Sequence, residues 1–321
     1  MEDLFRLLKP DFRVPELSFQ GRIAEVVLGS TPRYGGSSLH SLKVGGCRSL
    51  PFYSSEAKKP ILASIVCDSP EQLPQIMREE LRGLVEDPVE WAKTCLSLGA
   101  DAIALKFQKT HGSSDQRADV EDLTLRLLKE VRLPLIICTG GSEASLESLR
   151  VAAEVAKGER CMLASVTLED DYRSLVEAAL KYGHSIVAET DCDLPSQRSL
   201  NQKLIDMGVA KTKLLMDPTS APLGLGIEYS TSVIEQVRLD ALRGDESLQF
   251  PIVILRALEY SWKAREAADP STYRKPDLMG PLWEAHTALT LYLAGADLLG
   301  ILHPRTLRIL KAFLSDLGPG G

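Results

Sequence analysis

Eight short apolar runs, separated by segments with helical periodicity, constrain the fold of this chain more than any other feature. Each run is rich in Ile, Val and Leu and has the length of a strand. The runs are Ile61 to Val66, Ala102 to Phe107, Leu135 to Cys138, Met162 to Val166, Ser185 to Ala188, Lys213 to Met216, Ile252 to Leu255 and Leu298 to Leu302. Strands joined through helices must be parallel, and eight such units close most economically into an α/β, (β/α)8 TIM barrel, which is the fold we predict.

The intervening segments carry helix boundary signals. Asp87-Pro88-Val89-Glu90 predicts an N-cap, a proline at the first helical position and a glutamate three residues after the cap. Gly158, Gly183, Gly208 and Gly244 end other segments, as left-handed helix caps would. An open, doubly wound sheet is the weaker alternative, because no Gly-x-Gly-x-x-Gly follows the first strand.

The length of 321 residues suggests about two domains by itself, but barrels commonly hold roughly 200 to 250 residues or more in one unit. We predict that residues 61–317 form the barrel and that residues 1–60 form an N-terminal extension with a linker. Within the extension, Ile23 to Leu28 and His40 to Val44 predict the strands of a β-hairpin. Such a hairpin would plug the barrel floor or meet a partner.

Composition and charge narrow the classes of partner. With 37 basic and 44 acidic side chains the net charge is -7, and no basic stripe predicts nucleic-acid binding. No apolar run reaches membrane-spanning length, and Met1 to Pro10 lacks the uninterrupted apolar core of a signal peptide. We therefore expect no membrane association and a cytoplasmic location.

Cysteine and histidine spacing gives no local metal motif. The six cysteines lie more than 19 residues apart, so no Cys-x-x-Cys pair exists, and we expect any iron–sulfur cluster in a partner. His286 is spaced with Leu282, Leu289 and Leu293 along one helical stripe, which favours a core histidine. His303 directly follows the last strand at the barrel mouth, where helix capping and ligand contact are equally consistent with its position.

Two segments place polar and aromatic groups at this mouth. The segment Met216 to Ser230 follows the sixth strand and contains Asp217, Thr219, Ser220 and two glycines. The glycines either let a ligand approach the backbone closely or only shape a turn. The segment Glu259 to Gly280 holds Tyr260, Trp262 and Tyr273. Its aromatic residues favour either a lid over a ligand or a short helix packed by Trp262.

Six strings that occur in order make a resemblance specific. They are Val66-Cys67-Asp68-Ser69-Pro70, Asp87-Pro88-Val89-Glu90-Trp91-Ala92-Lys93, Lys181-Tyr182-Gly183-His184, Met216-Asp217-Pro218-Thr219-Ser220-Ala221-Pro222-Leu223-Gly224, Gly280-Pro281-Leu282-Trp283-Glu284 and Ala294-Gly295-Ala296-Asp297. Over about Ile23 to Phe313 the chain resembles the small (delta) subunit of the corrinoid iron–sulfur protein of the CO dehydrogenase/acetyl-CoA synthase system.

The resemblance implies a subunit that has no catalytic residue or metal ligand of its own. The family's barrel pairs with a large subunit that carries a [4Fe-4S] cluster and a corrinoid-binding domain, and the shared corrinoid (cobalamin) lies at the barrel mouth. A methyl group passes from a methyltetrahydrofolate or tetrahydropterin methyltransferase to acetyl-CoA synthase in the reductive acetyl-CoA (Wood–Ljungdahl) pathway. Because a corrin rim carries amides, the resemblance directs us to nine candidate cofactor contacts: Thr139, Gly140, Gly141, Asp217, Thr219, Ser220, Tyr260, Trp262 and His303.

Two other functions remain open. A free-standing pterin-dependent TIM-barrel methyltransferase would use Asp217 and Asp191 to hold the N–H groups of a pterin ring. An aldolase-like enzyme would use Lys106 or Lys213 as a Schiff-base lysine, although ion-paired lysines are far more common.

Overall fold

The computed structural model describes residues 18–50, 58–109, 115–168, 172–267 and 276–316. The segment Met1 to Pro10, part of the linker, Tyr273 and the barrel end at residue 317 lie outside these described residues.

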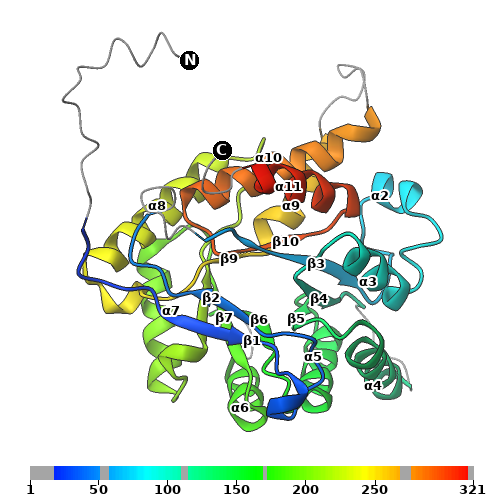
Figure 1. Ribbon diagram of the computed structural model, residues 1–321, viewed down its shortest axis with the longest axis horizontal. Coiled ribbons are helices and arrows are strands. Elements are labelled where there is room, and N and C mark those ends of the chain that lie inside the picture. Colours follow the sequence, from blue (N-terminus) through cyan, green and yellow to red (C-terminus); the bar gives the residue numbers. More distant parts are fainter. Residues whose placement is uncertain (1–17, 51–57, 110–114, 169–171, 268–275, 317–321) are drawn as a thin grey trace.

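Eight parallel strands form one sheet that curves into a barrel (Figure 1). The barrel strands are β3 (Ile61–Cys67), β4 (Ala102–Phe107), β5 (Leu135–Thr139), β6 (Met162–Val166), β7 (Ser185–Glu189), β8 (Leu214–Asp217), β9 (Val253–Ile254) and β10 (Leu298–Ile301). Their order is β8-β7-β6-β5-β4-β3-β10-β9. A bridge from Met216 to Ile252 and a hydrogen bond from Met216 N to Pro251 O, 2.9 Å long, join β8 to β9 and nearly close the ring. The predicted barrel and its eight strands are confirmed.

Helices and short helical turns connect the strands and cover the outside of the barrel. The α-helices are α2 (Gln75–Glu80), α3 (Pro88–Ser97), α4 (Gln116–Arg126), α5 (Glu143–Val155), α6 (Tyr172–Tyr182), α7 (Leu194–Asp206), α8 (Ile227–Arg243), α9 (Arg256–Ala267), α10 (Pro276–Ala294) and α11 (Pro304–Asp316). The short turns are η1 (Pro32–Tyr34), η2 (Leu127–Val131), η3 (Lys211–Lys213) and η4 (Glu246–Leu248).

The predicted helix boundaries have the expected chemistry. Asp87 Oδ1 accepts hydrogen bonds from Val89 N at 2.9 Å and from Glu90 N at 3.3 Å, so two backbone donors at the start of α3 are satisfied. The four glycines expected as caps all have positive φ, between 85° and 119°. Since side chains rarely adopt that region, these positions require glycine where the helices end.

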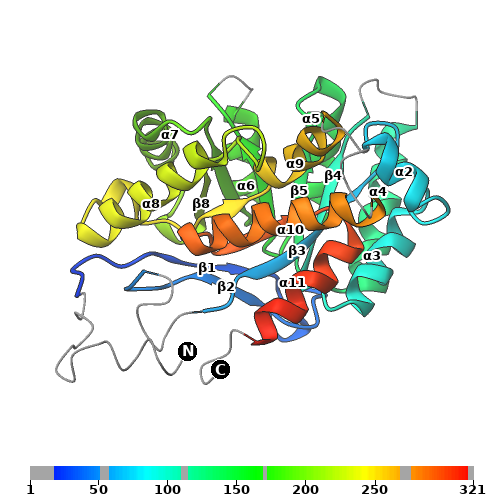
Figure 2. The ribbon, with the colours of Figure 1, turned by 90° about the horizontal axis from the view of Figure 1, so that it is seen from above.

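The N-terminal hairpin closes the floor of the barrel. Its strands β1 (Glu25–Leu28) and β2 (Leu42–Gly45) pair antiparallel and lie along one side of the barrel in Figure 2. Backbone hydrogen bonds run from Ala24 N to Gln249 O and from Gly29 N to Arg160 O, at 2.9 and 3.0 Å. Both acceptors precede barrel strands, so the hairpin contacts the amino ends of the strands. The sequence left two roles open for the hairpin, plugging the barrel floor or meeting a partner, and the hairpin lies at the floor. The domain boundary between residues 60 and 61 stays a prediction.

The interpretation of His286 as a core residue is wrong. His286 is exposed on α10, where its Nδ1 lies 2.8 Å from Leu282 O, and Leu293 is 54% exposed. The helix instead buries the face that carries Ala285 and Ala288, because small side chains allow it to approach the barrel. Since α10 is apolar on more than one face, hydrophobic spacing alone did not identify the buried one.

None of the helices in the described ranges combines the length and the apolar character needed to cross a lipid bilayer.

Candidate functional site at the barrel mouth

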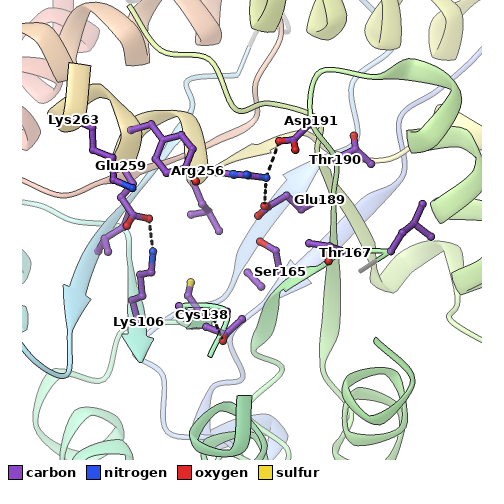
Figure 3. Close-up of a pocket in the computed structure, with 18 of the residues that line it drawn as sticks. Lys106, Cys138, Ser165, Thr167, Glu189, Thr190, Asp191, Arg256, Glu259 and Lys263 are labelled. Carbon is purple, nitrogen blue, oxygen red and sulfur yellow. Dashed lines mark hydrogen bonds and ion pairs between the residues drawn. The ribbon is translucent and has the colours of Figure 1, made fainter. Parts of the chain in front are cut away.

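A cavity of about 540 Å³ opens at the carboxyl ends of the strands. Its volume falls in the range of roughly 300 to 1,000 Å³ that small-molecule sites occupy, and this end of a barrel is where such sites lie. Side chains from the ends of β4 to β7 and from the start of α9 line it (Figure 3). The charged lining residues are Lys106, Glu189, Asp191, Asp193, Arg256, Glu259 and Lys263.

Most of these charges are paired with one another. Arg256 Nη1 lies 3.0 Å from Glu189 Oε1 and 2.8 Å from Asp191 Oδ1, and Figure 3 shows the guanidinium between the two carboxylates. On the other side of the cavity Lys106 forms an ion pair with Glu259. Two ion-pair clusters therefore form the opposite walls of the mouth.

Neither lysine considered for Schiff-base chemistry is suited to it. Burial alone would lower the pKa of Lys106, but the nearby Glu259 carboxylate outweighs that effect and the pKa lies above the usual lysine value. Lys106 is therefore held protonated, and a protonated amine is no nucleophile. Lys213 ends the turn η3 before β8, at the amino end of the strand and away from the mouth.

Asp217 lies beneath the mouth and anchors it. The side chain is 0% exposed. Its Oδ2 accepts hydrogen bonds from Leu255 N at 2.9 Å and Arg256 N at 3.2 Å, and its Oδ1 accepts one from Thr219 Oγ1 at 2.7 Å. Burial, together with the neighbouring carboxylate of Glu189, raises the pKa of Asp217 to about 7. The carboxyl thus fixes the backbone from which Arg256 reaches into the cavity.

Four of the nine sequence-derived candidates line the cavity, namely Thr139, Gly140, Gly141 and Tyr260. A Cβ built on Gly140 would lie 3.0 Å from Phe107 O, so a side chain has little room there. Gly141 has a φ of +87°, and a Cβ on it would meet nothing within 4 Å. The backbone at Gly141 is therefore uncovered on that side at the rim of the mouth, while its N–H donates to Thr139 Oγ1 at 3.0 Å.

The other five candidates do not line this cavity. Asp217 and Thr219 are completely buried and bonded to each other, and Ser220 Oγ lies 3.8 Å from Cys192 Sγ. Trp262 and His303 are each 1% exposed and stack with ring centroids 5.4 Å apart.

The interpretation of Trp262 as part of a lid is wrong. The segment after β9 is a helix from its first residue, and α9 turns the indole ring into the barrel wall. The alternative that the sequence left open, a helix packed by Trp262, is the one observed. His303 caps the next helix, because its Nδ1 accepts a hydrogen bond from Arg305 N at 3.0 Å.

Glu189, Arg256 and Glu259 are the site residues that the sequence reasoning missed. Glu189 is the last residue of β7, and Arg256 is the first of α9. Both residues could have been found from the sequence, because polar residues at the carboxyl ends of barrel strands commonly belong to the functional site. Their pairing joins elements that are 67 residues apart in the chain, which no local pattern reveals.

The thiols at the mouth are protected by burial. Cys138 lines the cavity but is 6% exposed, and burial raises its pKa to about 12. Burial also raises the pKa of Cys67, which is fully enclosed. Among the described residues no group of three or more His, Cys, Asp or Glu side chains is arranged to hold a metal ion.

Solved structures with a similar fold are dihydropteroate synthases. The Xanthomonas albilineans enzyme has a TM-score of 0.55 and 16% sequence identity, with 82% of this chain and 95% of that chain covered. The Coxiella burnetii enzyme has a TM-score of 0.55 and 11% identity, with 82% and 95% covered. At these identities the likeness shows the TIM-barrel fold alone.

Sequence comparison identifies the family. Residues 25–279 match the CO dehydrogenase/acetyl-CoA synthase delta subunit family. The delta subunit of the acetyl-CoA decarbonylase/synthase complex from Archaeoglobus fulgidus is 36% identical over 97% of this chain and 72% of its own length. The Methanopyrus kandleri delta subunit is 37% identical over 94% of this chain and 76% of its own length. The resemblance seen in the six strings is confirmed, and the chain belongs to the CO dehydrogenase/acetyl-CoA synthase delta subunit family.

Proposed function

We propose that the chain is the small subunit of a corrinoid iron–sulfur protein and that its mouth covers a corrinoid held by a cluster-bearing large subunit. In this role it serves the transfer of a methyl group from a methyltetrahydrofolate methyltransferase to acetyl-CoA synthase in the Wood–Ljungdahl pathway. Membership of the delta subunit family supports the proposal. The subunit is accessory, and the bound corrinoid supplies the cobalt chemistry.

Charge pairing at the mouth is the observation that carries this proposal. Arg256 pairs with Glu189 and Asp191, and Lys106 pairs with Glu259, so five of the seven charged lining residues are paired; the three cations and four carboxylates sum to a formal charge of -1. The side chains around a corrin ring are amides, which need hydroxyl, amide and peptide partners rather than charges.

The rim of the mouth offers partners of this kind. Thr139 lines the cavity with a hydroxyl that accepts a hydrogen bond from Gly141 N at 3.0 Å and lies 2.8 Å from Ser145 Oγ. The backbone at Gly141 has no neighbouring atom within 4 Å of the position that a Cβ would occupy, so a ligand amide can approach it there. A corrinoid is larger than the cavity, so this chain covers one side of it and the large subunit holds the rest. On this proposal Thr219, Trp262 and His303 support the mouth from behind rather than contact the cofactor.

Two leucines provide a matched test. Leu168 lines the cavity and is 38% exposed, whereas Leu180 is 44% exposed on the outside of α6. In the complex reconstituted with the large subunit, Leu168→Arg should lower cobalt retention after gel filtration about tenfold, because it places an unpaired charge against the corrin (~1.4 kcal/mol). Methyl transfer from methyltetrahydrofolate should slow in parallel. Leu180→Arg should behave as the wild type, and equal cobalt retention by both variants would refute the proposal.

A free-standing pterin-dependent methyltransferase is the second candidate. The observation that favours it is the fold, since the similar Coxiella burnetii dihydropteroate synthase was solved in complex with pteroic acid. Against it, the Asp217 side chain is completely buried beneath the mouth and does not line the cavity. Methyl transfer from methyltetrahydrofolate to free reduced cobalamin by this chain without the large subunit would support the second candidate.

A further inference from the structure

A second cavity, of about 560 Å³, adjoins the mouth cavity. Its walls are the segment from Gln72 to Glu79, which includes α2, and one face of α9. Gln72, Glu259 and Lys263 line both cavities, so the two meet at these side chains. An arm of a ligand in the mouth cavity therefore has a direct route into the second cavity.

Gln108 supplies a buried acceptor beside this junction. The residue follows β4, lines the second cavity and is 5% exposed. Its side-chain Oε1 has no hydrogen-bond partner within the described part of the chain. Buried polar atoms without a partner are rare in folded proteins and unfavourable, so this oxygen suits an N–H donated by a ligand.

The backbone of Gln108 is fixed against the rim of the mouth. Gln108 N donates to Asp68 Oδ1 at 2.7 Å, and Gln108 O accepts from Gln72 Nε2 at 2.7 Å. On the mouth side, a Cβ built on Gly140 would lie 3.4 Å from Gln108 Cα, and Gly140 lines the mouth cavity. The residue that carries the unpaired acceptor is thus in contact with the residue that borders the proposed corrinoid site.

The charges at the junction favour a neutral donor. Glu259 is paired with Lys106, so its carboxylate is not free to bind a cation from the ligand. Lys263 Nζ lies 4.4 Å from the centroid of the Tyr260 ring, so a cation already stands at the junction and would repel a ligand ammonium. A carboxylate has no N–H to donate to Gln108 Oε1, whereas a primary amide offers one without charge.

We propose that the junction holds one primary-amide arm of the corrin ring, with its N–H donated to Gln108 Oε1. Through this contact the subunit selects corrinoids with amide side chains over corrinoids with a free carboxylate at the same ring position. The inference rests on the proposed covering of a corrinoid and adds a residue that determines which corrinoid is accepted.

Isomeric cobalamin monocarboxylates, each with one primary amide replaced by a carboxylate, test the contact. Equilibrium dialysis against the complex reconstituted with the large subunit gives the Kd of cobalamin and of each isomer. One isomer should bind the wild type about tenfold more weakly than cobalamin, because it has no N–H for Gln108 Oε1. Gln108→Met keeps the length of the side chain and removes the acceptor, so it should weaken cobalamin about fivefold and reduce the preference over that isomer to about twofold.

The ratio of two Kd values on one protein does not depend on the folded fraction, so the comparison holds even if Gln108→Met folds less well. Gln202→Met is the matched control, since Gln202 is exposed on α7 and lines neither cavity. It should bind all the corrinoids as the wild type does. Equal binding of cobalamin and every isomer by the wild type, or an unchanged preference in Gln108→Met, would overturn the inference.

Leu168→Arg separates this outcome from failure of the proposed function. If Leu168→Arg lowers cobalt retention and Gln108→Met leaves the preference unchanged, the amide contact alone is refuted. If Leu168→Arg retains cobalt as the wild type does, the covering role is refuted and the amide contact with it.

Discussion

Two buried carboxyls hold the mouth at the scale of single residues. Asp217 accepts the backbone N–H groups of Leu255 and Arg256 at the start of α9. Glu284 is likewise 0% exposed and accepts the N–H of Leu302 at 2.6 Å and of His303 at 3.3 Å, just before α11. These N–H groups lie where a strand passes into a helix, so each acid satisfies backbone donors that burial would otherwise leave unpaired.

The pH dependence of stability should reveal the state of Asp217. Its pKa rises from 3.8 to about 7 on folding, because of burial and the charge of Glu189. The folded protein therefore binds this proton more tightly, and the resulting stabilisation is complete below pH 4 and is lost as the pH rises toward about 7. We expect the stability of the wild type relative to Asp217→Asn to fall between pH 4 and pH 7.

Urea unfolding of both proteins at several pH values measures this difference. A stability difference that stays constant across the range, or that grows with pH, would contradict a raised pKa at this carboxyl.

Sequence could locate Asp217 and His303 but not their roles. Both follow the end of a predicted strand, and a barrel brings all strand ends to one face. Whether such a side chain points into the cavity or underneath the loops depends on contacts with distant elements. For Asp217 those contacts are Leu255 and Arg256, 38 and 39 residues away.

At the scale of elements, strands were easier to predict than the helix that follows β9. Buried parallel strands are continuous apolar runs with glycine or proline at their ends, and each of the eight runs coincides with a strand. The α9 sequence is polar and aromatic, which fits a lid as well as a helix. Packing of Trp262 against α10 and His303 decides between them, and that packing is a tertiary effect.

Close packing of α9 on α10 should make Gly280→Ala destabilising. In an exposed helix interior this change would stabilise by up to about 1 kcal/mol. Here a Cβ would lie 2.4 Å from Trp262 Cζ3, so we expect a loss of about 1 to 3 kcal/mol instead.

A double-mutant cycle identifies the cause of that loss. Combining Gly280→Ala with Trp262→Phe, which shortens the ring system, should cost less than the sum of the two single changes. Thermal unfolding of the four proteins gives the coupling, and strict additivity would show that the indole is not the obstacle.

At the scale of the whole molecule, the floor hairpin and the barrel share one core. Val26 and Leu28 of β1 and Val44 of β2 are at most 1% exposed and belong to the same buried cluster as the barrel strands. The two cavities lie at the opposite end, on the carboxyl side of the strands. The hairpin therefore contributes to the stability of the barrel without contacting a ligand at the mouth.

A hairpin mutation should consequently unfold the barrel with it. Leu28→Ala removes a fully buried side chain and should cost about 2 to 5 kcal/mol. The three tryptophans of the chain, Trp91, Trp262 and Trp283, all lie outside the hairpin, so their fluorescence reports on the barrel alone. We expect Leu28→Ala to shift the single fluorescence-monitored urea transition to lower concentration, while Leu39→Ala, at a hairpin position 55% exposed, leaves it unchanged. An unchanged midpoint in Leu28→Ala would show that the hairpin unfolds separately and would favour two units with a boundary near residue 60.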